Sequence, residues 1–244
     1  MRWLPFALLL CSQGCADSDG PAPADASLEV RVADTTPDTP SPADGASERA
    51  LVDADAGVAS GPIKLFNGTD LTGIKLQTVE ASQITIDSGE LRCAAGKTGY
   101  WYTDRSYANY TLRFEVRFVR PPNLVNDADF TGNSGYPIHI QTPHQIWPTC
   151  IEVQGMYRDI ANIFPLGAPA VPVTLDNDAR AAAQRPVGQW NTMTIVSDSG
   201  RLTSWLNGVK IASSDAYSIT SGPIGFQCEG VEIHWRNIVL TPAP

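Results

Sequence analysis

The segment TLRFEVRF, residues 111–118, alternates apolar and polar side chains with a period of two. In an extended strand, successive side chains point to opposite faces of the sheet. One face of this strand would therefore pack on a core and the other would be polar, which is typical of an antiparallel sheet. The apolar side comprises Leu112, Phe114, Val116 and Phe118, and the charged side comprises Arg113, Glu115 and Arg117.

Similar strand signals recur from Pro62 onward, and turn residues separate them. Turn sequences such as Asp87-Ser88-Gly89 and Asn207-Gly208 would join neighbouring strands as hairpins. Only one short helix is expected, at 176–184. The pattern predicts an all-β antiparallel sandwich or jelly roll. The expected strands are 83–86, 90–93, 99–102, 110–118, 136–141, 150–154, 191–197, 201–206, 210–213, 224–228 and 231–240.

The first fifteen residues read as a bacterial secretory signal rather than as part of the fold. Arg2 is followed by an apolar run over 3–11 that is too short to cross a bilayer. The sequence Ser-Gln-Gly-Cys ending at Cys15 is similar to a lipobox, so we expect a lipid on Cys15. This places the protein in the cell envelope, on the outer membrane or facing the periplasm. An ordinary cleaved signal, and hence a secreted protein, is the alternative.

Residues 16–60 are expected to form a disordered acidic tether rich in Ala, Pro and Asp. This segment has ten acidic residues and two arginines, and therefore carries most of the net charge of −9. The remaining segment, 61–244, forms one domain that is close to neutral. No basic patch stands out, which argues against nucleic acid as a partner.

The domain contains three cysteines, Cys93, Cys150 and Cys228. An odd number allows at most one disulfide, and the spacing matches no zinc signature. We expect these residues to be free and buried, as small apolar side chains.

The expected strand CIEVQ at 150–154 places Glu152 and Gln154 on one face with Cys150. The strand at 136–141 would add His139 and Gln141 to a polar surface, and the charged side of 111–118 would extend it. Such a surface is either a solvated outer face with ion pairs or a cleft that holds a polar ligand. A sugar would suit the cleft, because aromatic rings stack on it while amides and carboxylates bind its hydroxyls. The aromatic residues near these segments are Trp101, Tyr102, Trp147 and Tyr157.

Several motifs in order resemble the 3-keto-disaccharide hydrolase family (DUF1080), also described as 3-keto-glucoside lyase or hydratase domains. They are LFNGTDLTG at 65–73, GNSG at 132–135, CIEVQG at 150–155, GQWNTMTIV at 188–196 and SGPIGFQ at 221–227. The resemblance covers 62–241 and implies a concanavalin-like jelly-roll sandwich of two antiparallel sheets.

The chain departs from the family pattern at two places. Ile74 replaces the tryptophan that commonly ends the opening motif. A histidine often follows the segment at 221–227 in the family, whereas this chain has Cys228, Glu229 and Gly230 there. Glu229 or His234 would have to take the role of that histidine, if it has one.

The resemblance implies an enzyme that cleaves 3-keto-glycosides by proton abstraction, elimination and hydration, with net hydrolysis. Glu152 is the expected base, because a carboxylate beside an apolar strand can have a raised pKa. His139 is the expected acid or enolate donor. The oligosaccharide or glycoside substrate would be bound by Gln154, Arg113, Asn133, Gln141, Gln227, Trp147 and Tyr157.

No cofactor is expected, although a divalent cation on His139, Glu152 and Asp159 is possible. Glu115 is expected to pair with Arg113 or Arg117, but with Glu152 it could also form the carboxylate pair of a glycosidase. A different class of function is a non-catalytic carbohydrate-binding lipoprotein displayed on the cell surface. An adhesion or scaffold protein is a third class, and it requires no concave polar face.

Overall fold

The computed structural model describes residues 61–243 with the exception of residue 97. The expected signal segment, Cys15 and the whole expected tether at 16–60 lie outside these residues. Within the described part, no helix is long and apolar enough to span a membrane.

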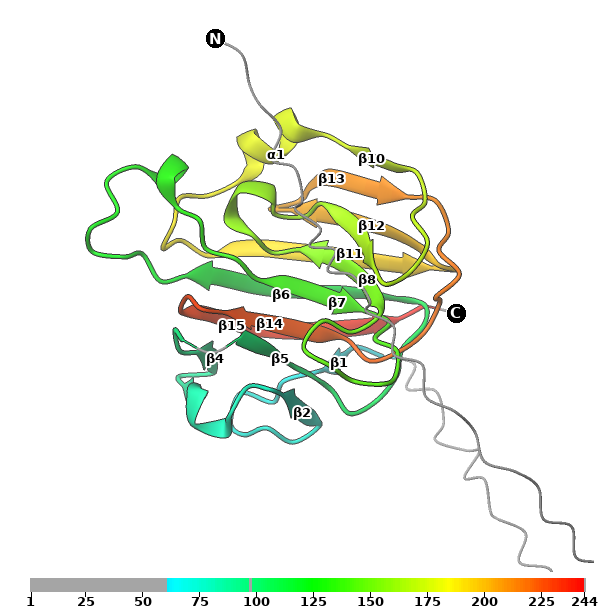
Figure 1. Ribbon diagram of the computed structural model, residues 1–244, viewed down its shortest axis with the longest axis horizontal. Coiled ribbons are helices and arrows are strands. Elements are labelled where there is room, and N and C mark those ends of the chain that lie inside the picture. The colour runs from blue at the N-terminus through cyan, green and yellow to red at the C-terminus, as the bar shows by residue number, and fades with distance from the viewer. Residues whose placement is uncertain (1–60, 97, 244) are drawn as a thin grey trace, which may run out of the picture. The chain divides into compact units, whose positions relative to one another are not determined.

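The described domain is a sandwich of antiparallel β-sheets, and its first layer is a nine-stranded sheet (Figure 1). The strand order is β10-β13-β12-β11-β6-β15-β4-β3, with β1 paired to β15. The expected antiparallel pairing of strands is confirmed for this layer. Its strands are β1 (Ile63–Lys64), β3 (Ile84–Asp87), β4 (Glu90–Cys93), β6 (Tyr110–Phe118), β10 (Val173–Leu175), β11 (Asn191–Asp198), β12 (Arg201–Leu206), β13 (Val209–Ser214) and β15 (Ile233–Pro242).

The second layer consists of two three-stranded sheets, β14-β5-β2 and β7-β8-β9. Strand β7 lies beside β14, because Asn133 bridges Glu229 and the Ser134 hydroxyl donates to the Gln227 carbonyl at 2.9 Å. We call this layer the small layer. Its strands are β2 (Ile74–Gln77), β5 (Thr98–Thr103), β7 (Gly135–Ile138), β8 (Cys150–Gln154), β9 (Ile163–Leu166) and β14 (Gly225–Glu229).

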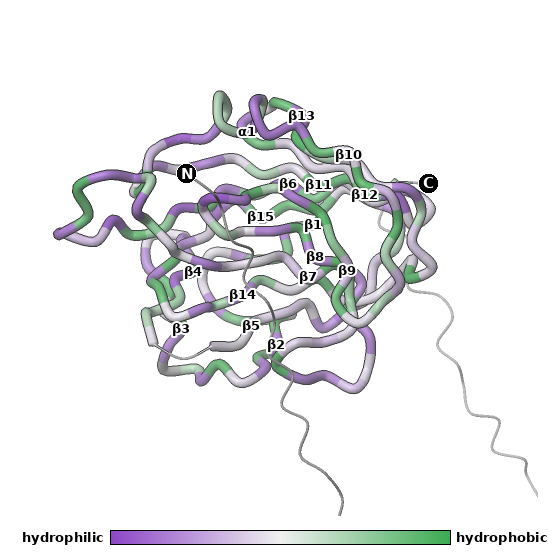
Figure 2. The backbone as a smooth tube through the Cα atoms, turned by 45° about the horizontal axis from the view of Figure 1, so that its top comes forward, coloured by the Kyte–Doolittle hydropathy of each residue, from purple (hydrophilic) through white to green (hydrophobic). Residues whose placement is uncertain are grey.

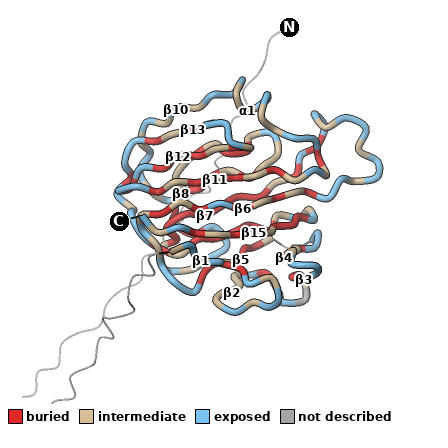
Figure 3. The backbone as a smooth tube through the Cα atoms, turned by 180° about the vertical axis from the view of Figure 1, so that it is seen from behind, coloured by how far each residue is buried: buried red, intermediate tan, exposed pale blue. Residues whose placement is uncertain are grey.

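The core lies between the two layers and is rich in aromatic side chains. The Trp101 ring stacks on Phe226 with 4.0 Å between centroids, and Phe226 meets Phe114 edge to face at 5.0 Å. The alternation of 111–118 places Phe114 here, as expected, because β6 is central in the large sheet. Buried residues accordingly follow the central strands β6, β11 and β15 (Figure 3).

Loops and helical turns are shorter elements around this sandwich. The loop after β6 is mostly hydrophilic (Figure 2) and contains η2 (Asp127–Asp129). The expected helix is present as α1 (Asn177–Ala183), and its N-cap Asp176 accepts a hydrogen bond from the Ala179 amide. The remaining turns are η1 (Ala81–Gln83) and η3 (Tyr157–Asp159).

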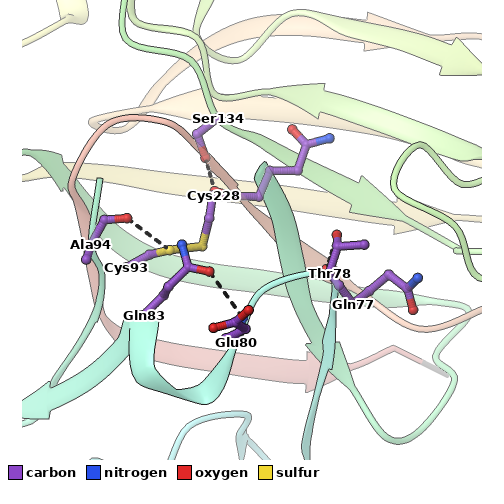
Figure 4. The surroundings of a disulfide bond; sticks show 9 residues. Gln77, Thr78, Glu80, Gln83, Cys93, Ala94, Ser134 and Cys228 are labelled. Atoms are coloured by element: carbon purple, nitrogen blue, oxygen red, sulfur yellow. Dashed lines mark hydrogen bonds between the residues drawn. A yellow bond between two sulfur atoms is a disulfide. The ribbon is translucent and has the colours of Figure 1, made fainter. Parts of the chain in front are cut away.

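A disulfide joins Cys93 on β4 to Cys228 on β14 (Figure 4). The expectation of free thiols is therefore wrong for this pair, and Cys150 is the buried free cysteine of the domain. The cross-link connects the large sheet to the small layer across 135 residues of sequence. Closing a loop of this length restricts the unfolded chain and contributes about 5 kcal/mol of stability in the chain-entropy model.

Candidate functional site

The candidate site lies on the outer face of the small layer, where β8 and β14 flank β7. In β8, Ile151 and Val153 belong to the core, so Glu152 points outward. In β14, Phe226 packs in the core and Cys228 bonds across it, so Gln227 and Glu229 point outward. Strict alternation of side chains thus places the polar groups of both strands on one surface.

Glu152 is the most shielded carboxyl of this surface, with 5% of its area exposed. Its cross-strand neighbours are Pro137 on β7 and Phe164 on β9. The Gln227 amide donates to Glu152 Oε2 at 3.1 Å. Burial raises the pKa of Glu152 to about 8; the Gln227 hydrogen bond opposes this and the charge of Glu229 adds to it. At neutral pH the carboxyl is therefore mostly protonated.

Glu229 forms a second amide–carboxyl pair next to the first. The Asn133 side-chain amide donates to Glu229 Oε2. Burial raises the pKa of Glu229, although the hydrogen bond from Asn133 opposes the shift. In each pair the amide NH₂ group donates a hydrogen bond to the carboxyl. The amide oxygens of Gln227 and Asn133 have no hydrogen-bond partner in the described residues. The site therefore contains two carboxyls and two unpaired carbonyl oxygens.

The loop between β7 and β8 covers part of the same face. The His144 ring stacks on Tyr102 with 4.6 Å between centroids, and its Nδ1 lies 3.5 Å from the Tyr100 hydroxyl. Beneath the loop, Tyr100 packs with Cys150, and burial raises the pKa of the Cys150 thiol. Trp147, predicted as a sugar ligand, lies on this loop and is 46% exposed.

His139 does not lie beside Glu152, and the predicted pairing of the two is wrong. Its backbone has a φ of 57°, which ends β7 and turns the side chain inward. The ring is fully buried, with Nδ1 3.2 Å from the Ile219 carbonyl and Nε2 3.2 Å from the Ser197 hydroxyl. Burial lowers the pKa of His139 and so disfavours the charged imidazolium form. It is a hydrogen-bonded residue of the core.

The charged side of β6 also lies away from Glu152, on the outer face of the large sheet. Arg113 is exposed there, and Glu115 accepts hydrogen bonds from Arg236 at 2.5 Å and Asn237 at 3.1 Å. The predicted role of Arg113 as a substrate ligand with Glu152 is therefore wrong, as is a glycosidase pair of Glu115 and Glu152. The expected partnership of Glu115 is found with Arg236 instead.

The other predicted ligands differ in position. Gln154 shares the face of Glu152, but its Oε1 accepts from the Gly155 and Met156 amides at 2.8 Å. Gln141 donates to the carbonyls of His139 and Ser221, so it holds the chain after β7.

Tyr157 is also away from the site. Its hydroxyl donates to Asp127, and its ring packs on Phe130 with 5.5 Å between centroids. It therefore closes the edge of the core.

The structure does not bring together the residues considered for a cation. Asp159 binds Arg180 and Asn162, while His139 is in the core. Across the residues described, no group of three or more His, Cys, Asp or Glu side chains could hold a metal ion.

Glu229, rather than His234, stands at the site. His234 lies on the outer face of the large sheet, where Nε2 is 2.8 Å from Glu232 and Nδ1 is 3.2 Å from Arg117. Phe164 was missed entirely, because only the pairing of β8 with β9 places it opposite Glu152. Gly135 was also missed, although it ends the quoted GNSG motif.

Comparisons with known proteins identify the family and the fold. A family model described as the 3-keto-alpha-glucoside-1,2-lyase-like domain matches residues 61–241. No curated protein matches the chain. One similar solved structure is a proposed glycosyl hydrolase from Parabacteroides distasonis, with 19% identity and a TM-score of 0.56, covering 76% of this chain and 95% of that one.

Two further solved structures come from Bacillus subtilis. A protein of unknown function with a galectin-like fold has 12% identity and a TM-score of 0.54, covering 74% of this chain and 94% of that one. The carbohydrate-binding module CBM66 has 9% identity and a TM-score of 0.51, covering 69% of this chain and 95% of that one. At these identities the likeness shows the fold alone, and it confirms the jelly-roll sandwich.

The family match supports a role on carbohydrates and spans nearly all of the described residues. The chain belongs to the family of 3-keto-alpha-glucoside-1,2-lyase-like domains.

Proposed function

We propose that the domain cleaves 3-keto-α-glucosides by elimination followed by hydration, with Glu152 as the general base. One observation carries the proposal. Glu152 is buried among apolar neighbours with Gln227 as its hydrogen-bond donor, so its pKa is raised to about 8. A base of this pKa is matched to proton abstraction near neutral pH.

The chemistry follows from the ketone at carbon 3 of the sugar. The ketone acidifies the hydrogen on carbon 2, and ionised Glu152 takes this proton to give an enolate. The enolate expels the glycosidic oxygen from carbon 1, leaving a double bond between carbons 1 and 2. The departing oxygen takes a proton, for which the Glu229 carboxyl is a suitable source because burial raises its pKa. Water then adds to carbon 1 and a proton returns to carbon 2, so the net reaction is hydrolysis.

The alternative function is sugar binding without catalysis. It is supported by the exposed Trp147 and the half-buried Phe164 and Tyr102, whose rings are of the kind that stack on sugars. A binding module needs open contact with its ligand, whereas Glu152 is nearly removed from water. The shielding of Glu152 therefore favours the enzyme.

The decisive experiment is a comparison of oxidised and unoxidised substrates. The purified protein should convert a 3-keto-α-linked disaccharide to its two monosaccharide products and leave the unoxidised disaccharide intact. Product formation is followed by chromatography. Binding of both sugars without turnover of either would replace the enzyme with the binding module.

We also propose that the chain is exported and carries a lipid on Cys15. The disulfide between Cys93 and Cys228 supports export, because such bonds persist in oxidising compartments. Replacing Cys15 with Ser should release the protein from the membrane fraction of cells and abolish its labelling by a radioactive fatty acid. Retention of the label in that variant would contradict the lipid attachment.

A further inference from the structure

A groove of about 410 Å³ lies at one end of the large sheet, at the base of the loop that projects after β6 (Figure 1). The end of β6 and the segment that leads into β15 line it, and the Val119 amide there donates to the Glu232 carbonyl at 3.0 Å. Gly188 lines another side, where a Cβ atom would lie 3.2 Å from the Arg120 Cβ. The volume is within the range of about 300–1,000 Å³ that is typical of small-ligand pockets. The β6–β15 groove therefore has room for a ligand, on the opposite outer face from Glu152.

Arg117 gives the groove a guanidinium with unused donors. Its Nη2 lies 3.3 Å from Glu90 Oε2 and 3.2 Å from His234 Nδ1. Its Nε is buried and has no hydrogen-bond partner in the part of the chain that the structure describes. A guanidinium has five N–H donors, and a buried donor without an acceptor is destabilising. A ligand oxygen that accepts from Arg117 would therefore be favoured.

Glu232 gives the groove an acceptor, and its neighbours add an apolar wall. The Glu232 side chain is 45% exposed, and its Oε1 lies 2.8 Å from Nε2 of the buried His234 ring, which holds the carboxylate in place. Phe118 and Val119 line the same groove, and 38% of Val119 is exposed. A ligand with both hydroxyl groups and apolar C–H groups would match this combination.

The charges around the groove favour a neutral ligand. Arg117 is paired with Glu90, and Arg120 is paired with Asp127. An anion in the groove would approach the carboxylates of Glu90 and Glu232. A cation would approach the guanidinium groups of Arg117 and Arg120. A neutral hydroxyl group meets neither repulsion, because it can accept from a guanidinium and donate to a carboxylate.

We infer that the β6–β15 groove binds a neutral sugar unit of an oligosaccharide, as a second carbohydrate site. The inference goes beyond the proposed function: it rests on the carbohydrate role of the family and not on proton abstraction by Glu152. Because the groove and Glu152 lie on opposite outer faces, one sugar unit cannot occupy both. The groove would hold a neighbouring glycan chain or a distant unit of the same chain, which raises the effective concentration of substrate at the other face.

The first test is calorimetric binding of unoxidised tetrasaccharides to the full exported chain. Maltotetraose and cellotetraose are the neutral probes, and tetragalacturonic acid is the anionic probe. At least one neutral probe should bind with a Kd of about 1 mM or lower, and the anionic probe should bind at least about 5-fold more weakly than that one. Binding of neither neutral probe would overturn the site, and tighter binding of the anionic probe would overturn its preference for neutral sugars.

The second test places the bound sugar in the groove. Glu232→Ala should weaken binding of the neutral probe at least about 10-fold, because a hydrogen bond to a charged acceptor is lost. The matched control is Asp215→Ala, which removes another exposed carboxylate, that of the Arg201 pair, and should change binding less than about 2-fold. Equal binding by the native chain and Glu232→Ala would put the sugar elsewhere and overturn the inference.

Arg117→Lys tests the donor. Lysine keeps the positive charge that faces Glu90 but lacks the planar group of N–H donors. We expect binding of the neutral probe to weaken at least about 5-fold, and unchanged binding would remove Arg117 from the site. If this variant does not fold, the comparison of Glu232→Ala with Asp215→Ala still decides.

Turnover of methyl 3-keto-α-glucoside is measured separately on the native chain. Sugar binding that depends on Glu232, without turnover, would reject the proposed reaction and keep the groove. Turnover without binding that depends on Glu232 would reject the groove and keep the reaction.

Discussion

The two outer faces of the sandwich both carry glutamates from alternating strands, yet the environments of Glu115 and Glu152 are opposite. On the large sheet, partial burial of Glu115 is outweighed by the hydrogen bond and charge of Arg236, with help from Asn237 and Arg113, so its pKa is lowered. On the small layer, Glu152 has an amide rather than a cation as its partner, and burial raises its pKa. The partner, more than the position in a strand, decides whether a carboxyl is held ionised or protonated.

The outer face of the large sheet is rich in paired charges. Arg117 and Arg236 lie over the Trp190 ring, with guanidinium carbons 4.7 and 4.1 Å from its centroid. Glu90 accepts from Arg92 and Arg117. Such pairs contribute modestly to stability, whereas the small layer retains unpaired acceptors. The contrast predicts that substitutions on the small layer affect chemistry and those on the large sheet affect stability.

Replacing Glu152 with Gln should give the largest effect. We expect kcat/KM on a 3-keto-α-glucoside to fall by about 1000-fold, because the base is lost while the shape is kept. The melting temperature should stay within a few degrees at about pH 4, where the native carboxyl is largely protonated in both the folded and the unfolded chain. The matched control is Glu115→Gln, which should retain turnover within about 2-fold. Full activity in Glu152→Gln would remove Glu152 from its proposed role.

Replacing Gly135 with Ala should give the next largest effect. The added methyl group would occupy the point on which Glu152 and Gln227 converge. We expect kcat/KM to fall by about 100-fold and the free energy of unfolding to fall by about 1–3 kcal/mol, as for an overpacked site. Gly61→Ala is the control, because a Cβ there meets nothing within 4 Å. Equal activity of both variants would show that the close approach of Glu152 and Gln227 to Gly135 is not needed for turnover.

The pH dependence of turnover should reflect the raised pKa of Glu152. Only the ionised carboxylate is a base, so kcat/KM should rise about tenfold per pH unit and level off above about pH 8. The measurement is a pH profile of kcat/KM at substrate concentrations well below KM. A plateau that already begins near pH 5 would contradict the shielded carboxyl.

The same shift predicts how stability depends on pH. Between the ordinary pKa of 4.5 and about 8, the folded chain keeps the Glu152 proton and the unfolded chain has lost it. The free energy of unfolding should therefore fall by about 1.4 kcal/mol per pH unit in this window. Denaturant unfolding of the native chain and of Glu152→Gln isolates the contribution, because the variant lacks this slope. If the free energy of unfolding of the two proteins changed with pH in parallel, the raised pKa of Glu152 would be contradicted.

The smallest effect is expected from Glu115→Gln. The lowered pKa of Glu115 contributes stability that is present above its ordinary pKa and is lost as the pH falls through the folded value. Because the pair with Arg236 is partly exposed, the loss at pH 7 should be at most about 1 kcal/mol. Denaturant unfolding at pH 7 measures it, and a loss of several kcal/mol would erase the distinction between the two faces.

Alternation predicted the direction of side chains well, because it depends only on local geometry. It placed Phe114 in the core and Glu152 opposite Ile151 and Val153, as the structure has them. It failed at His139, where a positive φ interrupts the strand and reverses the side chain. The periodicity of the sequence does not predict a residue with a positive φ within a strand.

The arrangement of the strands in space could not be predicted from the sequence pattern. Alternation assigns Arg113 to a polar face, but it does not say which sheet that face belongs to. Likewise, the register that sets Phe164 beside Glu152 and the pairing of Cys93 with Cys228 depend on contacts between distant segments. Three cysteines allow several pairings, and only the packing of β4 against β14 selects one.

The bond between Cys93 and Cys228 has a consequence for how the protein is handled. Cys228 is the residue between Gln227 and Glu229, so the cross-link anchors the backbone that presents both side chains. Protein prepared with strong reductant would have the right sequence and a less constrained candidate site. Assays of this chain should therefore begin from air-oxidised protein with its thiol content counted.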